Sequence, residues 1–135
     1  MYRFYGTSEC PLSPTGHLRL LEWTGDVGMD DVRVGDAFVL TRADAPCVLF
    51  CPLDAWERLE GDLWSFSRTP SDERNRLRTM LRWAEEVVVD EAYRVQVPMQ
   101  LAAYAELDRR ALAVGRGDHL EIWDPSRRAV ERSLA

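Results

Sequence analysis

The sequence contains no lysine, so all 17 of its lysine-plus-arginine positions are arginines. The 23 acidic residues outnumber them, which gives a net charge of −6 at pH 7 and a pI near 4.9. Because nucleic-acid binding depends on neutralising phosphates, this acidic total argues mildly against a nucleic-acid partner. Local clustering of the arginines matters more than the sum, so the argument is weak.

Long apolar runs are also absent. No run approaches the roughly 18 residues that span a bilayer, and the N-terminal stretch MYRFYGTSEC lacks the apolar segment of a signal peptide. We therefore expect a cytosolic protein with no membrane partner. With 135 residues, 46% of them hydrophobic, the chain is long enough for one domain or for two small halves that share a core.

Cysteine and histidine are scarce, with three and two copies. Cys47 and Cys51 fall in one expected strand, where they would lie about 13 Å apart, too far for a disulfide or a shared metal ion. A metal site would need Cys10, His17 or His119 to converge on one of them, and no spacing indicates this. Catalytic motifs such as G-x-S-x-G and H-E-x-x-H are missing. The sequence therefore predicts no metal, no cofactor and no enzymatic activity.

Strand patterns flank a helical middle. Strands are expected within 37–51 around a turn at 43–46, and at 87–90, 94–97, 111–115 and 119–123. Helices are expected from Leu53 onward, from about 72 to 86 after a break at SRTPSDE, from Pro98, and from Pro125 with Asp124 as its N-cap. We divide the chain into a first repeat with its helix (1–60), a linking helical segment (61–86) and a second repeat with its C-terminal helix (87–135).

Two stretches of the first half recur in the second half. GHLRLL begins at residue 16 and corresponds to YRVQVP, which begins 77 positions later at residue 93. VLFCPLDAW begins at residue 48 and corresponds to LEIWDPSRR, which begins 72 positions later at residue 120. A half of this length buries too little surface to be stable alone. We therefore expect an α+β fold, a tandem duplication whose halves interlock into one pseudo-two-fold β core with flanking helices.

The second copy carries a charged pair, Asp90 and Arg94, in an otherwise apolar hairpin. An arginine at a hairpin tip offers five N–H donors that suit a phosphate or the O6 and N7 atoms of guanine. A carboxylate four residues earlier can hold the guanidinium in one rotamer. The alternative is a structural Asp90–Arg94 bridge without a ligand, and the residues alone favour this alternative.

These segments resemble the MraZ family, bacterial regulators of the division and cell-wall gene cluster that are built from two AbrB-like (SpoVT-AbrB) swapped-hairpin repeats. The resemblance rests on VLTR and CVLFCPLDAWERLE within 39–60, on VVVDEAYRVQVP at 87–98, and above all on VGRGDHLEIWD at 114–124. Phe4, Gly6 and Leu12 also have the family's spacing. The resemblance therefore covers essentially the whole chain and favours a bound ligand over a bare structural bridge.

The family motif is D-x-x-G-R followed by alternating apolar residues and a proline, once per repeat. The resemblance implies that the arginines contact DNA and that the aspartate braces the turn. The second repeat matches with Asp90 as the brace and Arg94 as the DNA-binding residue, although Tyr93 replaces the glycine.

The first repeat departs further from this motif. Ser13, His17 and Leu21 stand where the aspartate, arginine and proline belong, and Gly16 is kept. Arg19 lies two positions beyond His17, on the same strand face if a strand begins there. We expect a DNA-binding face made of Arg94, Arg19, His17 and Arg3, weaker in the first repeat.

The resemblance implies a sequence-specific transcriptional regulator that binds double-stranded promoter repeats at the nucleoid. It also implies a ring-like homo-oligomer, and apolar helix positions that one small core leaves uncovered, Trp56, Leu59 and Leu63, support self-association. The alternative is a ring-forming interaction module of the same fold that has lost DNA binding. The degenerate first motif, the missing lysines and the low pI favour that alternative.

Overall fold

The computed structural model describes residues 2–65 and 71–134 and contains eight strands within them. Their bounds are β1 Thr7–Pro11, β2 His17–Arg19, β3 Ala37–Arg42, β4 Val48–Pro52, β5 Glu85–Val88, β6 Arg94–Gln96, β7 Arg110–Gly115 and β8 Leu120–Trp123. The helices are α1 Leu53–Ser65, α2 Ser71–Trp83, α3 Met99–Tyr104 and α4 Pro125–Leu134, with short 3-10 turns η1 Leu20–Glu22 and η2 Met29–Asp31. The expected α+β class is confirmed.

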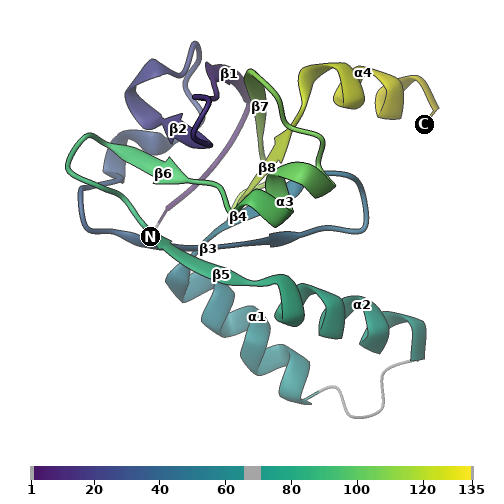
Figure 1. The fold of residues 1–135 in the computed structure, drawn as a ribbon. Coiled ribbons are helices and arrows are strands. Elements are labelled where there is room, and N and C mark those ends of the chain that lie inside the picture. Colours follow the sequence, from purple (N-terminus) through teal and green to yellow (C-terminus); the bar gives the residue numbers. More distant parts are fainter. Residues whose placement is uncertain (1, 66–70, 135) are drawn as a thin grey trace.

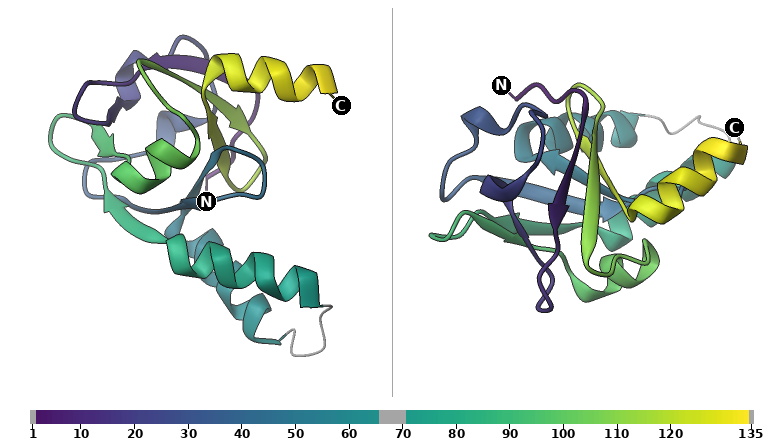
Figure 2. Two further views of the ribbon diagram at one scale, coloured as in Figure 1. Left: turned by 45° about the vertical axis from the view of Figure 1, so that its right-hand side comes forward. Right: turned by 90° about the horizontal axis from the view of Figure 1, so that it is seen from above.

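Six strands form one antiparallel sheet in the order β1-β7-β8-β4-β3-β5, and β2 and β6 pair separately as a two-stranded ribbon (Figure 1). The helices α1 and α2 extend together from the sheet as an arm. The ribbon and α4 lie on opposite sides of the body in every view (Figure 2). The ribbon therefore stands clear of both the arm and α4. In the described part of the chain, every helix is too short or too polar to span a bilayer.

The strand order is palindromic when each strand is replaced by its counterpart from the other half of the chain. Reading inward, β1 matches β5, β7 matches β3 and β8 matches β4. Each half also lends a strand to the other, because β1 pairs with β7 and β5 pairs with β3. The facing residues Leu18 and Val95 are 77 positions apart, and Leu49 and Glu121 are 72 apart, which are the spacings of the sequence repeats.

One buried cluster joins the ribbon to the sheet and draws on both halves. It includes Leu18 and Val95 from the ribbon with Phe38, Phe50 and Leu120 from the sheet, each fully buried. The rings of Phe38 and Phe50 stack with their centroids 4.4 Å apart. Truncating a buried leucine of this kind costs about 2–5 kcal/mol. The inner face of the ribbon is therefore held by the core, and its outer face is accessible to solvent and to a binding partner.

The packing of α1 differs from the sequence prediction. Trp56 was expected to be uncovered, but it is buried against Val39 and Cys51, with Leu59 and Met80 partly buried beside it. The strands and α2 of the same chain supply this cover, which sequence periodicity cannot show. The Leu63 side chain lies outside the described residues, as do residues 67–70 of the helix break predicted at SRTPSDE (67–73). The last three residues of that segment belong to α2.

The helix α2 ends at Trp83, three residues earlier than the predicted end at 86, and β5 begins at Glu85 instead of residue 87. Glu85 and Glu86 pair with Leu40 and Val39 of β3. Their helix propensity is outweighed by the ladder hydrogen bonds of an edge strand. The N-cap prediction for α4 is confirmed, because Asp124 Oδ2 accepts hydrogen bonds from the amides that open the helix, at 3.1 and 3.3 Å.

Candidate nucleic-acid interface

The ribbon has one buried and one exposed face. Leu18 and Val95 lie opposite each other and point into the core. Side chains alternate along a strand, so the flanking residues share the outer face. They pair across the ribbon as Arg19 with Arg94 and His17 with Gln96. The structure therefore places three of the four predicted DNA-binding residues on one surface.

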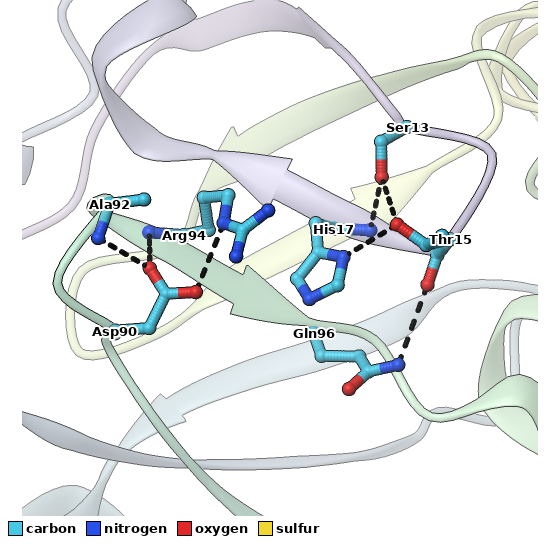
Figure 3. Close-up of polar contacts among 7 residues, drawn as sticks. All are labelled: Ser13, Thr15, His17, Asp90, Ala92, Arg94 and Gln96. Atoms are coloured by element: carbon cyan, nitrogen blue, oxygen red, sulfur yellow. Dashed lines mark hydrogen bonds and ion pairs between the residues drawn. The ribbon is translucent and has the colours of Figure 1, made fainter.

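The turn before β6 is closed by Asp90. Its Oδ1 accepts hydrogen bonds from the amides of Arg94 at 2.8 Å and Ala92 at 3.0 Å, and its Oδ2 accepts one from Arg94 Nε at 3.0 Å (Figure 3). Desolvation raises the pKa of Asp90, but the hydrogen bonds and positive charge of Arg94 outweigh it and hold the pKa below its usual range. The carboxylate thus caps the turn and orients the guanidinium at once.

The brace uses only Nε of Arg94. Among the described residues, the two terminal nitrogens of that guanidinium have no hydrogen-bond partner, and the side chain is 36% exposed. Their parallel N–H groups match two acceptors on one base edge or on a phosphate. Arg94 is therefore held in place by its protein contact and still has donors to offer.

The turn before β2 repeats the same backbone pattern 77 positions earlier. The Ser13 amide donates to the His17 carbonyl at 3.1 Å, the Gly16 amide to the Ser13 carbonyl at 2.9 Å, and the His17 amide to Ser13 Oγ at 2.9 Å. Each has its equivalent around Asp90, including Tyr93 N–H to the Asp90 carbonyl at 2.9 Å. The Ser13 hydroxyl replaces one carboxylate oxygen of Asp90. Ser13 itself has no second oxygen that could hold the side chain at position 17.

The residue directly before each ribbon strand has a left-handed backbone conformation, with φ of 82° at Gly16 and 62° at Tyr93. A non-glycine residue in this conformation costs roughly 1–2 kcal/mol. Tyr93 offsets that cost through its hydroxyl, which donates to the Val32 carbonyl. Its carbonyl accepts from the Leu20 amide at 3.0 Å, just as the Gly16 carbonyl accepts from the Val97 amide at 2.8 Å, so this bond is common to both turns. The hydroxyl contact therefore explains how the turn tolerates the loss of the family glycine.

Each outer arginine has its own acid. Arg19 contacts Glu22 at 3.1 Å and Arg94 contacts Asp90 at 3.0 Å. Two guanidinium groups directly opposite on a ribbon repel each other, and the paired acids relieve this repulsion. Exposed pairs such as Arg19–Glu22 contribute only about 0–1 kcal/mol, so an incoming phosphate can displace Glu22 at little cost.

Two residues singled out in the sequence lie outside the ribbon strands. Arg3 belongs to neither ribbon strand and precedes Phe4, whose amide donates to the Gly117 carbonyl at 2.7 Å. Its place in the site stays a prediction. Leu21, at the position of the family proline, lies in η1 and is 76% exposed.

Sequence reasoning missed Thr15, Gln96 and Glu22. Thr15 Oγ1 contacts His17 Nδ1 at 2.8 Å, and Gln96 Nε2 donates to the Thr15 carbonyl at 3.4 Å. The alternation of YRVQVP was the available signal for Gln96, because it places this residue on the face of Arg94. Nothing in the motif pointed to Thr15, which occupies a variable position.

The cysteines take no part in this surface. Cys10, Cys47 and Cys51 are buried and free, and burial raises the pKa of each thiol to about 12. They are therefore protonated packing groups at neutral pH. Within residues 2–65 and 71–134, no three His, Cys, Asp or Glu side chains are grouped to hold a metal ion.

The fold and the ribbon define an α+β class in which paired hairpin turns carry basic side chains on one exposed face. The family model for MraZ protein matches residues 80–127, the segment that holds Asp90 and Arg94. The transcriptional regulator MraZ of Shewanella loihica is 40% identical over 81 residues, which cover 60% of this chain and 53% of that protein. The protein of the same name from Halothermothrix orenii is 32% identical over 95 residues, which cover 70% of this chain and 66% of that protein.

The chain belongs to the MraZ family. A third relative, the transcriptional regulator MraZ of Shewanella sediminis, is 35% identical over 91 residues and is covered to 60% of its length. The chain thus spans between 53 and 66% of the length of these three relatives.

Proposed function

We propose that the chain is a sequence-specific transcriptional regulator that binds double-stranded DNA through the outer face of the β2–β6 ribbon. The supporting observation is the state of Arg94, which Asp90 orients while its terminal nitrogens stay available. A two-stranded ribbon fits the major groove, where an arginine can donate to O6 and N7 of guanine. The relatives are named transcriptional regulators, which supports the same role here.

The two arginines contribute differently in this proposal. Arg94 keeps its contact with Asp90 and binds through free donors, so little conformational freedom is lost on binding. Arg19 must exchange Glu22 for a phosphate. This exchange costs little because the Arg19 and Glu22 side chains are 55% and 45% exposed. Arg94 therefore supplies the specific contact and Arg19 the electrostatic one. Because Glu22 and Asp90 balance both charges, affinity per chain is modest.

Self-association would multiply this modest affinity. We propose a ring-like homo-oligomer that places several ribbons on repeated promoter boxes, so that later contacts are intramolecular and avidity exceeds single-site affinity. The target we propose is the promoter of the division and cell-wall gene cluster, in the cytoplasm at the nucleoid. Both proposals rest on the family.

The architecture supports a tandem duplication of an AbrB-like swapped hairpin. We propose repeats at 1–60 and 87–135, joined by the helical segment 61–86. The palindromic strand order and the exchange of β1 and β5 between halves are the features that such a duplication would leave. The ribbon would then be the place where the two repeats present their motifs together.

An electrophoretic shift tests the function, with DNA from upstream of the chain's own gene and unrelated DNA of equal length as the control. Binding should prefer the upstream DNA, and log affinity should fall with log salt at about −0.9 per phosphate contact. A shift that is absent at low salt while light scattering reports an intact oligomer would favour the ring-forming interaction module instead.

A further inference from the structure

The first turn contains a chain of hydrogen bonds that the second turn lacks (Figure 3). The His17 amide donates to Ser13 Oγ at 2.9 Å, Ser13 Oγ lies 3.0 Å from Thr15 Oγ1, and Thr15 Oγ1 lies 2.8 Å from His17 Nδ1. The position equivalent to Thr15 in the second turn is Ala92, which has no hydroxyl group. The chain of hydroxyl groups is therefore specific to the copy that lost its aspartate and arginine.

The His17 amide favours one direction of donation along this series of hydrogen bonds. Ser13 Oγ accepts the amide proton of His17, so its own hydrogen is free to be donated to Thr15 Oγ1, 3.0 Å away. In this direction Thr15 Oγ1 donates to His17 Nδ1, 2.8 Å away. Each hydroxyl then accepts one hydrogen bond and donates one, and bonds in such a series strengthen one another. The reverse direction would bring two donors to Ser13 Oγ and leave the serine hydrogen without a partner in the chain.

We infer that Thr15 holds neutral His17 in the tautomer with its proton on Nε2, so that the first turn offers DNA a neutral hydrogen-bond donor instead of a cation. The proton of an imidazole resides on the nitrogen opposite the one that accepts a hydrogen bond. Among the described residues Nε2 has no partner, and His17 lies on the outer face opposite Gln96.

This inference rests on the proposed function and refines it. An Nε2–H donor suits the acceptors of the major groove, which are N7 and O6 of guanine, N7 of adenine and O4 of thymine. His17 then contributes to sequence readout and hardly to the salt dependence of binding. Thr15 is a positioning residue, since it acts only through the imidazole.

The charged groups near His17 keep their charges between pH 7.5 and 8.5. Arg19 follows on the same strand and is paired with Glu22, and Arg94 lies diagonally across on β6 and is paired with Asp90. Arginines and carboxylates do not titrate in this range. If His17 binds DNA as a neutral donor, its contribution to affinity is therefore equal at both pH values. A contribution from a cationic imidazole would instead decrease as the pH rises.

The first arm of the test is ¹⁵N NMR of the full chain, free of DNA and labelled at its two histidines, with His17→Gln to assign the His17 signals. At pH 7.5 the wild type should show a protonated Nε2 and an unprotonated Nδ1. Thr15→Val, which keeps the shape but removes the hydroxyl, should give a mixture of tautomers, and Thr15→Ser should restore the wild-type signals. A protonated Nδ1 in the wild type, or no change in Thr15→Val, overturns the inference whatever the protein does with DNA.

The second arm titrates the same variants with the upstream DNA at pH 7.5 and 8.5. Thr15→Val should weaken binding about two- to tenfold, the range expected for one neutral hydrogen bond, equally at both pH values. Thr15→Ser should bind like the wild type, and the salt slope should be unchanged. Equal affinity of Thr15→Val and wild type overturns the donor role of His17. Absence of any wild-type binding, with the expected NMR tautomer, instead rejects the proposed function and with it the DNA contact, while the assignment of the proton stands.

Discussion

The two hairpin turns have the same backbone hydrogen bonds but different side chains at their first and last positions. Ser13 and Asp90 both accept the amide four residues later, at 2.9 and 2.8 Å. Only the carboxylate has a second oxygen, and only that turn orients an arginine. The comparison shows that the first motif residue has two separable tasks, capping the turn and aiming the cation. A serine retains the first task and loses the second.

Removing the cation from the intact turn should have the largest effect. Arg94→Ala should weaken binding to the upstream DNA by about 1–3 kcal/mol per site if the residue reads a base. Arg82→Ala provides the matched control, because Arg82 is an exposed arginine in the last turn of α2, away from the ribbon. A shift assay at fixed salt measures both. Equal affinity of Arg94→Ala and wild type, with the oligomer intact, would reduce the Asp90–Arg94 pair to a structural bridge.

Removing the capping residues should separate the two tasks. Ser13→Ala should lower the free energy of unfolding by about 1 kcal/mol, as loss of one capping hydrogen bond does. Asp90→Ala should lower it further, because two amides and a guanidinium lose their acceptor, and it should also weaken DNA binding. Denaturant unfolding compares the variants. A smaller loss for Asp90→Ala than for Ser13→Ala would contradict the assignment of two tasks to the carboxylate.

The sequence predicted the backbone of the two turns better than the contacts of their side chains. The repeat spacing and the pairing of Asp90 with Arg94 could be predicted from the sequence, because local patterns encode turns and strands. The partner of Arg19 was not, since Glu22 reaches it only through the 3-10 turn that follows β2. The role of Thr15 was not predictable either, because it depends on a hydroxyl chain through three side chains.

Long-range packing set the other limit on prediction. Glu85 and Glu86 continue a helical pattern, and only the presence of β3 beside them makes them a strand. Trp56 looked uncovered because its partners Val39 and Met80 are distant in the sequence. By contrast, the cap of α4 was predictable from Asp124 and Pro125 alone, since a cap requires only its own first turn.

Restoring the family residues to the first turn should give a moderate gain in affinity. His17→Arg should tighten binding severalfold at pH 7.5, because it adds a permanently charged guanidinium with five N–H donors. Adding Ser13→Asp should tighten binding further by restoring the brace, and a double-mutant cycle would give a favourable coupling term. Additive effects of the two substitutions would show that the carboxylate does not orient the arginine.

The smallest effect expected is a difference in acid sensitivity between the turns. The pKa of Asp90 is lowered in the folded protein, so its carboxylate stabilises the turn above the unfolded value of about 3.9. That contribution disappears as pH falls through the lowered folded pKa, whereas Ser13 does not titrate. NMR of the Arg94 and His17 amides between pH 5 and 2 should show a titration step for Arg94 alone. A matching step at His17 would mean that the two turns open together.

The most direct measurement of the central claim is arginine footprinting, for which a chain without lysine is well suited. An arginine-specific dicarbonyl reagent, read out by mass spectrometry, reports the exposure of each arginine with and without the upstream DNA. The ribbon account predicts protection of Arg94 and Arg19 by DNA, with unchanged reactivity of Arg74, Arg78 and Arg82 on α2, which are exposed in the free protein. Protection of the α2 arginines, with Arg94 and Arg19 reacting equally in both states, would contradict it.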